Sequence, residues 1–201
     1  MRCLVLLAAA TVIHAETGVS VTADAGETWL SVSLRGGPEV GTPFVNIAKA
    51  LASEMFASAG VHVEWCVGRS ACRYWEDRIV VTLEDVAPRT LSEMALADAQ
   101  VFEGRHVRIV LDRVKGRVHK SLRSKLLAHV LVHEVTHLVQ ACDRHSATGV
   151  MKARWDRPDY KMMAKRALGF TTDDVDLIQM GLAKRRERRG RLFWGRPTRP
   201  I

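Results

Sequence analysis

The sequence lacks several features that would assign it to a common class of protein. After residue 15, no stretch approaches the roughly 20 apolar residues that a membrane-spanning helix needs. There is no internal repeat and no low-complexity linker before the C-terminal end. No Ser–His–Asp or Cys–His set and no phosphate-binding glycine loop is evident. These absences argue against an integral membrane protein, a serine or cysteine hydrolase, and a P-loop nucleotide-binding enzyme.

The composition is that of one globular domain with an N-terminal export signal. With 201 residues, 47% hydrophobic and 26% charged, the chain can bury a core of its own. Arg2 gives a positive start, residues 4–13 are almost wholly apolar, and Ala15 ends a small-residue cleavage site. This is the layout of a signal peptide over residues 1–15. We therefore expect a secreted or periplasmic protein whose mature chain begins near Glu16.

Cysteine is scarce, and three cysteines remain after removal of the signal peptide. Cys66 and Cys72 flank five residues that include Gly68, so they can form a disulfide in an oxidising compartment. Two alternatives stay open, namely free buried thiols and a metal site with His62. The metal site is weaker because zinc-binding cysteines usually lie two to four residues apart. Cys142 has no evident partner, and we expect a packed or free thiol.

The net charge of +8 is concentrated at the C-terminal end. Residues 184–199 contain eight basic side chains and one acidic side chain, so everything before residue 184 sums to +1. We expect residues 184–201 to form a flexible basic tail. Such a tail is suited to polyanions or an anionic membrane surface, although a solvated end is the simpler interpretation. No specific nucleic-acid partner is expected.

Periodicity and capping signals predict an α+β domain over residues 16–183. Strands are expected at residues 19–22, 29–34, 61–65, 78–83 and 106–111. One helix is expected to begin at Thr42 and Pro43, and another at Thr171 or Thr172. Residues 120–141 contain no Gly or Pro and predict one long helix. The order favours a sheet covered mostly on one face.

The most informative pattern is His133-Glu134-Val135-Thr136-His137, within the expected long helix. Residues four apart share a helix face, so both imidazoles can reach one Zn²⁺ at about 2.0–2.1 Å. Glu134 then stands beside the metal and can act as general base toward an activated water. His129, one turn earlier, is expected to pack or to support the ligands, because a fourth protein ligand would close the site.

A catalytic zinc needs a third protein ligand, and the candidates after the helix are Asp143 and His145. The run from His133 to Met151 resembles the metzincin clan of zinc peptidases, HExxHxxGxxH followed by a methionine turn. The stretch HEVTHLVQACDRHSATGVMKARW is also similar to small secreted bacterial metzincin-like proteins with His-Ser-x-x-Gly-(Ile/Val)-Met-(Lys/Arg)-Ala. The specific resemblance covers about residues 119–183.

The chain departs from the clan pattern after the second histidine. The positions of the clan's glycine and third ligand hold Gln140 and Asp143, whereas His145 comes two residues later. The clan's spacing favours Asp143 and the narrower group favours His145, which we prefer as third ligand. Ala153 replaces the clan's usual tyrosine. Tyr160 could lean into the site, but a packed aromatic is the simpler interpretation.

The resemblance implies a zincin-like domain: a twisted mixed sheet, a backing helix, an active-site helix, a methionine turn at Met151 and a C-terminal helix. Met151 would be a packing floor and not a ligand. The implied activity is a secreted, monomeric zinc endopeptidase with Glu134 as general base. Its peptide or protein substrate would lie extended along residues 106–111 as an edge strand. The alternative is a zinc-binding protein without proteolytic activity.

Overall fold

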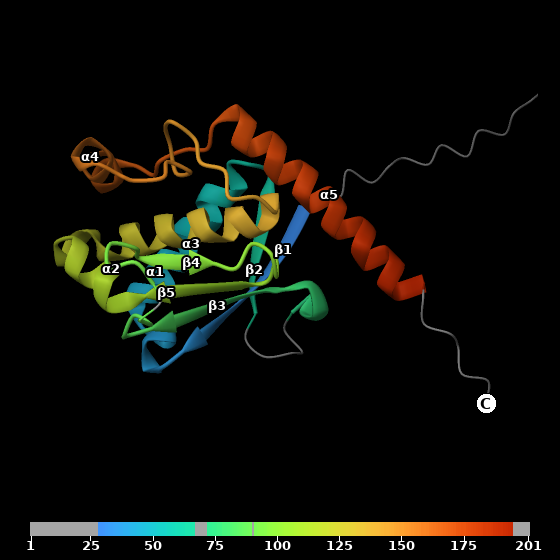
Figure 1. The fold of residues 1–201 in the computed structure, drawn as a ribbon, viewed down its shortest axis with the longest axis horizontal. Coiled ribbons are helices and arrows are strands. Elements are labelled where there is room, and N and C mark those ends of the chain that lie inside the picture. The colour runs from blue at the N-terminus through green and yellow to red at the C-terminus, as the bar shows by residue number, and fades with distance from the viewer. Residues whose placement is uncertain (1–27, 67–71, 90, 195–201) are drawn as a thin grey trace, which may run out of the picture.

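The computed structural model of the chain describes residues 28–66, 72–89 and 91–194. The signal peptide expected at residues 1–15 and the strand expected at residues 19–22 lie outside the described residues. The fold is α+β, with a five-stranded sheet of order β2-β1-β3-β5-β4 (Figure 1). Its strands are β1 (Thr28–Gly36), β2 (Val61–Cys66), β3 (Ile79–Glu84), β4 (Ala97–Ala99) and β5 (His106–Val110). All neighbouring strands are parallel except β4 and β5, which are antiparallel.

The described residues also form five α-helices and three short 3₁₀ helices. The α-helices are α1 (Pro43–Ala57), α2 (Leu111–Arg117), α3 (Arg123–Gln140), α4 (Arg157–Lys165) and α5 (Thr172–Trp194). The 3₁₀ helices are η1 (Pro38–Gly41), η2 (Trp75–Asp77) and η3 (Lys120–Leu122). Of these helices, α1, η1 and η2 lie between strands and the others follow β5. As the sequence predicted, Thr42 caps α1 and accepts a hydrogen bond from the Val45 amide. None of the described helices is long and apolar enough to cross a membrane.

The core lies between one face of the sheet and the pair α1 and α3, which pack side by side. Leu30 and Val32 of β1 contribute to this core, and Ser31 and Ser33, which alternate with them along the strand, are buried as well. The middle of α3 is buried on nearly every side, from Leu126 to Val139, apart from Glu134. Figure 1 shows why, because α3 lies between the sheet and the segments that carry α4 and the start of α5.

A close approach of two helices brings α5 against the end of α3. Gly181 of α5 lies so close to the carbonyl of Val139 that any added Cβ atom would clash with it. Ile178 and Leu182, on the same stretch of α5, are buried as their spacing predicted. The first half of α5 is therefore held on the helix that carries the HExxH motif.

Besides the short 3₁₀ helices, one strand and two α-helices were not predicted, and each has a local reason. β4 has only three residues, too few for an alternating pattern to be recognised. α2 has only seven residues and contains Gly116, a residue that is unfavourable in the interior of a helix. α4 begins in a stretch rich in turn-forming residues, although Asp156 and Asp159 form a complete capping box there. The edge strand is β4, so the prediction that residues 106–111 form the edge was wrong.

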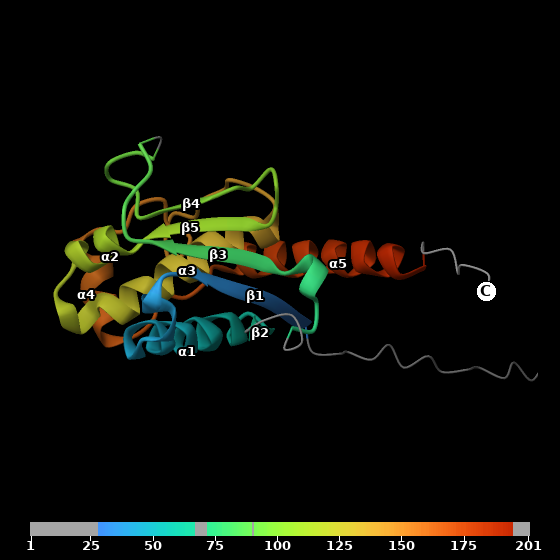
Figure 2. The ribbon, with the colours of Figure 1, turned by 90° about the horizontal axis from the view of Figure 1, so that it is seen from below.

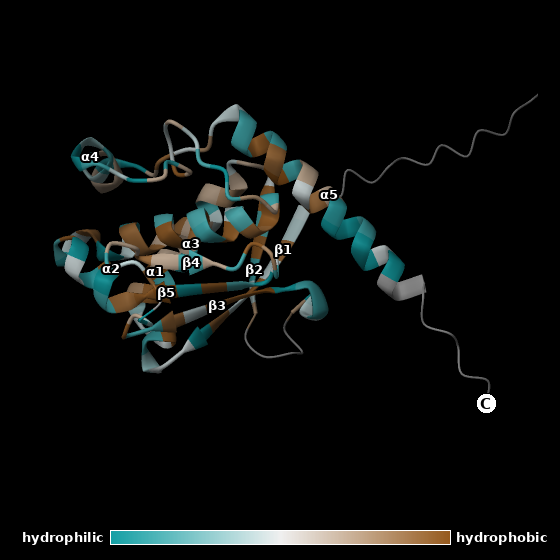
Figure 3. Cartoon of the chain, viewed as in Figure 1, coloured by the Kyte–Doolittle hydropathy of each residue, from teal (hydrophilic) through white to brown (hydrophobic). Residues whose placement is uncertain are grey.

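The flexible tail predicted from residue 184 was also wrong for residues 184–194, which continue α5. Arg185 is 3% exposed and donates hydrogen bonds to the carbonyls of Gly104 and Asp77. Arg189 donates to the Asp77 carboxylate at 2.9 Å, and its guanidinium stacks over Tyr74. These contacts tie part of the basic run to the body. In Figures 1 and 2 the helix continues past the end of the sheet, and Figure 3 shows its hydrophilic second half.

Candidate metal centre

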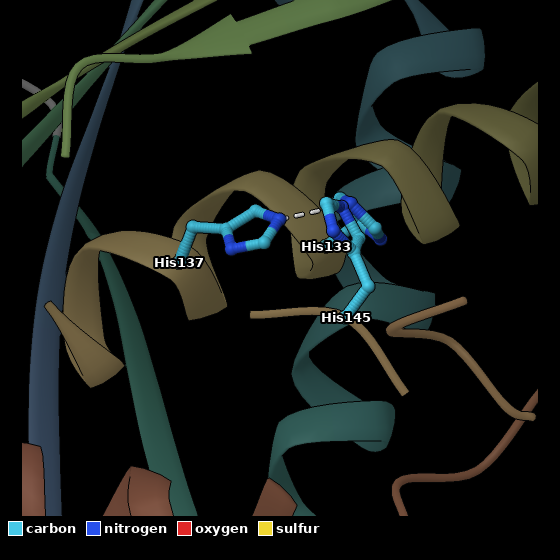
Figure 4. Close-up of side chains that lie close together, drawn as sticks. All are labelled: His133, His137 and His145. Carbon is cyan, nitrogen blue, oxygen red and sulfur yellow. Dashed lines mark hydrogen bonds between the residues drawn. The ribbon is translucent and has the colours of Figure 1, made fainter. Parts of the chain in front are cut away.

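Three histidine side chains converge at the open side of α3. His133 and His137 come from α3 and His145 from the loop that follows it (Figure 4). Each ring offers one nitrogen, and the three nitrogens all lie within 4.8 Å of one another. His133 and His137 are 8% and 4% exposed, whereas His145 is exposed. The preferred third ligand of the sequence analysis is therefore the histidine that the fold brings to the other two.

Backbone carbonyl groups orient both helix histidines. The Nδ1 atom of His133 lies 2.9 Å from the carbonyl oxygen of Val150, and that of His137 lies 3.1 Å from the carbonyl oxygen of Cys142. A carbonyl oxygen can only accept, so each Nδ1 must carry the proton. In the neutral rings, each Nε2 atom then has a lone pair, which is the state that binds a metal.

The two Nε2 atoms lie 3.1 Å from each other, and this distance tests whether a cation fits. Two lone pairs at this separation repel unless a proton or a metal ion lies between them. Two nitrogens about 2.05 Å from one tetrahedral Zn²⁺ would be about 3.3 Å apart, close to the observed separation. The spacing of the two helix nitrogens thus fits a transition metal such as zinc, and His145 offers a third nitrogen within 4.8 Å.

Burial favours the metal-binding protonation state of the helix histidines. It lowers the pKa of His133 to about 4 and also lowers that of His137, because an imidazolium is poorly solvated in the interior. For Glu134, burial raises the pKa to about 8, and the negative charges of Asp98 and Asp143 add to the effect. A nearby cation acts in the opposite direction on a carboxylate and favours its ionised form.

The loop between the second and third histidines begins with an unusual backbone conformation. α3 ends at Gln140, and Ala141 adopts the left-handed region at φ 52°, where glycine is normally favoured. This turn directs the Cys142 carbonyl back toward His137. The absence of a glycine left no sequence signal for this turn.

The turn that contains Met151 contacts the histidine cluster through the carbonyl oxygen of Val150. Gly149 has φ 79° and lies against the carbonyl of Gly169, which leaves no room for a Cβ atom. The Met151 side chain is fully buried, and its carbonyl accepts a hydrogen bond from the Ser146 amide at 2.8 Å. Val150, which orients His133, belongs to the same turn. Met151 is therefore a buried core residue, which is consistent with the packing role that the resemblance implied.

A cleft of about 1160 Å³ opens over the three histidines and Glu134. One wall is β4 with its flanking loops, which are Met94–Leu96 and Gln100–Glu103. The other wall includes Trp155, whose ring meets His133 edge to face at 5.6 Å, and Tyr160. Tyr160 is half-buried and packs against the core, yet it lines the cleft as well.

The remaining site predictions have clear positions in the fold. Cys66 and Cys72 form a disulfide with an S–S distance of 2.16 Å, which removes both sulfurs from any metal site. Cys142 is a free, partly buried cysteine. His129 is buried, with Nδ1 bonded to the Lys125 carbonyl and Nε2 accepting from the Leu168 amide. It supports packing, as predicted.

Asp143, the alternative third ligand, is exposed and is not part of the histidine cluster. It lines the cleft and acts electrostatically on Glu134 and His137. The sequence analysis did not identify Asp174, a fully buried carboxylate beside the ligand loop. Asp173 and Asp174 are adjacent at the start of α5, where acidic residues are favoured in any helix, so the sequence does not reveal that one is exposed and the other buried.

Comparisons with known proteins give no family assignment. No protein-family model matches the sequence, and no curated protein is significantly similar to it. The chemistry of the cleft is therefore argued from its own geometry.

Proposed function

We propose that the protein is an exported zinc endopeptidase with a zincin-like domain. One observation carries the proposal: three histidine nitrogens within 4.8 Å of one another share a cleft with Glu134. A purely structural zinc site needs four protein ligands and no base, whereas a hydrolytic site keeps a position open. The His133, His137 and His145 set, which could hold one Zn²⁺, is of the open kind.

The residues of the cleft account for the steps of peptide hydrolysis. When bound, Zn²⁺ supplies a Lewis acid that polarises the scissile carbonyl and lowers the pKa of water. Glu134 adjoins the first ligand on α3 and accepts a proton from the attacking water. It then gives that proton to the amine of the departing peptide.

The substrate is proposed to bind along β4 rather than β5. β4 pairs with β5 through one edge, and its three residues line the cleft. An extended peptide can hydrogen-bond to the remaining edge of such a strand. This arrangement requires an unfolded or extended segment of the target protein and depends little on its side chains.

The Cys66–Cys72 disulfide supports export. Disulfides persist in oxidising compartments and are rare in the cytosol. It agrees with the signal peptide predicted at residues 1–15, which would be removed near Ala15.

The test is zinc content and proteolysis of the exported protein, with the Glu134→Gln variant beside it. We expect about one zinc per chain and cleavage of an unstructured substrate such as casein. Glu134→Gln is expected to retain zinc and to lose roughly 10²–10⁴-fold in rate, the usual contribution of a general base. Glu54→Gln on α1, away from the cleft, is the matched control and keeps full activity.

Two outcomes would contradict the proposal in different ways. Full zinc content without cleavage of any unstructured protein would favour the zinc-binding, proteolytically inactive alternative. Full zinc-dependent activity of Glu134→Gln would leave the peptidase but exclude Glu134 as its base.

A further inference from the structure

A buried carboxylate lies beside the loop that presents the third histidine. Asp174, in the first turn of α5, is 0% exposed. Its Oδ1 atom accepts hydrogen bonds from the Ser146 hydroxyl at 2.6 Å and from the Arg144 guanidinium at 3.0 Å. Its Oδ2 atom accepts from the hydroxyl and amide of Thr171 at 2.7 and 3.0 Å. Both oxygens are therefore satisfied, each by a different segment of the chain.

The two oxygens serve two separate structural purposes. Oδ2 completes the cap of α5, because the Asp174 amide in turn donates to the Thr171 hydroxyl. Oδ1 instead reaches across to a loop 28 to 30 residues earlier in the chain. An isolated ionised carboxylate would be costly to bury, but hydrogen bonds and a guanidinium compensate for the lost hydration. The cap alone does not require the contacts of Oδ1.

The partners of Oδ1 are the two residues that flank His145. Arg144 precedes the proposed ligand, Ser146 follows it, and both bond to the same oxygen atom. The Ser146 amide also donates to the Met151 carbonyl, which joins this point to the turn beneath the site. Among the described contacts, the exposed His145 ring has only its neighbours His133 and His137. Its position therefore depends on how its backbone is held.

We propose that Asp174 is the positioning residue of the metal centre, holding Arg144 and Ser146 so that His145 meets the two helix histidines. The inference rests on the proposed function in that the three histidines bind one cation. It adds a role for α5, which contributes no ligand. Residues that orient metal ligands commonly change metal affinity by about 10–100-fold when they are removed.

The test compares four variants in zinc affinity, measured on the full-length, metal-free protein by competition with a chromophoric chelator. Asp174→Asn keeps the size of the side chain but removes its charge and one acceptor, so we expect the Kd for zinc to rise at least about 10-fold. Ser146→Ala removes the hydroxyl that donates to Oδ1 and accepts from Arg144 at 3.3 Å, leaves the contacts of Oδ2 intact, and is expected to weaken zinc binding by a smaller factor. Co²⁺ absorption is expected to lose intensity in both variants as the third ligand is released.

Two control variants separate positioning from helix capping and from surface charge. Thr171→Ala removes the hydroxyl contact of Oδ2 and is expected to lower the melting temperature while changing zinc affinity by less than about 3-fold. Asp173→Asn changes the adjacent, 77% exposed carboxylate, which contacts only the outer Nη2 of Arg144, and is expected to bind zinc like the unmodified protein.

Each outcome decides the matter. If folded Asp174→Asn binds zinc as tightly as the unmodified protein, or if Thr171→Ala loses as much affinity as Asp174→Asn, the positioning role is wrong. If Asp174→Asn does not fold, Ser146→Ala decides, and unchanged affinity and Co²⁺ absorption of that variant overturn the inference. Absence of zinc binding by the unmodified protein overturns the proposed function and this inference with it.

Discussion

The metal centre has two halves, and they are held in different ways. The helix half, His133 and His137, is buried on α3, and each ring donates to a backbone carbonyl. The loop half, His145, is exposed and is positioned through Arg144 and Ser146 by a carboxylate on α5. The helix half is placed by the periodicity of α3 alone. The loop half is placed by the packing of α5, a distant element of the chain, against the loop.

This difference implies that the two halves respond differently to mutation. The helix histidines serve the interior as well as the metal, because their rings satisfy the carbonyls of Cys142 and Val150. His145 has no such second purpose among the described contacts. Stability of the metal-free protein and affinity for zinc should therefore separate the halves experimentally.

The largest expected effect comes from removing single histidines. His133→Ala or His137→Ala is expected to weaken zinc binding by at least ~10³-fold, since each loses one of three ligands in a preformed site. Each is also expected to destabilise the metal-free protein by about 1–3 kcal/mol, because a carbonyl is left without its donor. His145→Ala is expected to weaken zinc binding by ~10²-fold and to leave metal-free stability nearly unchanged.

Chelator competition and thermal unfolding of the metal-free variants provide these two measurements. The comparison fails if His145→Ala destabilises the metal-free protein as much as His133→Ala does. In that case the loop histidine has a structural role that its exposed position does not reveal.

The next largest effect is expected in how the stability of the metal-free protein depends on pH, which should again distinguish His133 from His145. The pKa of His133 is lowered from 6.5 to about 4, so between these pH values the unfolded chain binds a proton that the folded chain does not. Its contribution is complete above pH 6.5, and about 3 kcal/mol is lost as pH falls to 4. His133→Gln should remove this loss, and His145→Gln, at an exposed position, should retain it.

Glu134 is expected to change the stability of the metal-free protein with pH in the opposite direction to His133. Its pKa is raised from 4.5 to about 8, so the folded chain keeps a proton that the unfolded chain releases. Metal-free stability should therefore fall as pH rises from 4.5 to 8, and Glu134→Gln should abolish this fall. Denaturant unfolding at a series of pH values measures both slopes. A stability profile that Glu134→Gln leaves unchanged would contradict the burial of this carboxyl group.

The smallest expected effect concerns the alternative third ligand. Asp143→Asn is expected to change zinc affinity by less than about 3-fold, because Asp143 is exposed and lies outside the histidine cluster, so only a screened charge is lost. The same chelator competition measures it. A loss comparable to that of His145→Ala would assign the third ligand to Asp143 instead.

The helical half of the site could be predicted because its determinants are local. Five consecutive residues and the helix period place His133, Glu134 and His137, and apolar neighbours identify the helix as buried. Thr42 with Pro43 marked the start of α1 for the same reason, since capping depends on a few adjacent residues. The Cys66–Cys72 disulfide was predicted from spacing and compartment.

For the loop half, local sequence signals limited the third ligand to two candidates, Asp143 and His145, but could not decide between them. The left-handed turn falls on Ala141, and alanine rarely adopts this conformation, so the sequence does not predict it. Asp173 and Asp174 look alike in the sequence, yet one is exposed and the other is buried against the loop. The basic run after residue 184 likewise looked solvated, because its partner Asp77 lies about a hundred residues earlier.

The sequence by itself thus determined that His133, Glu134 and His137 lie together on one helix, that Cys66 and Cys72 can pair, and that the fold is α+β. Each depends on spacing along one element or on composition. Only the tertiary structure decided that His145 completes the cluster, that β4 forms the edge of the cleft, and that α5 holds the ligand loop. These features depend on contacts between residues far apart in the chain, whose pairing is selected by packing of the whole domain.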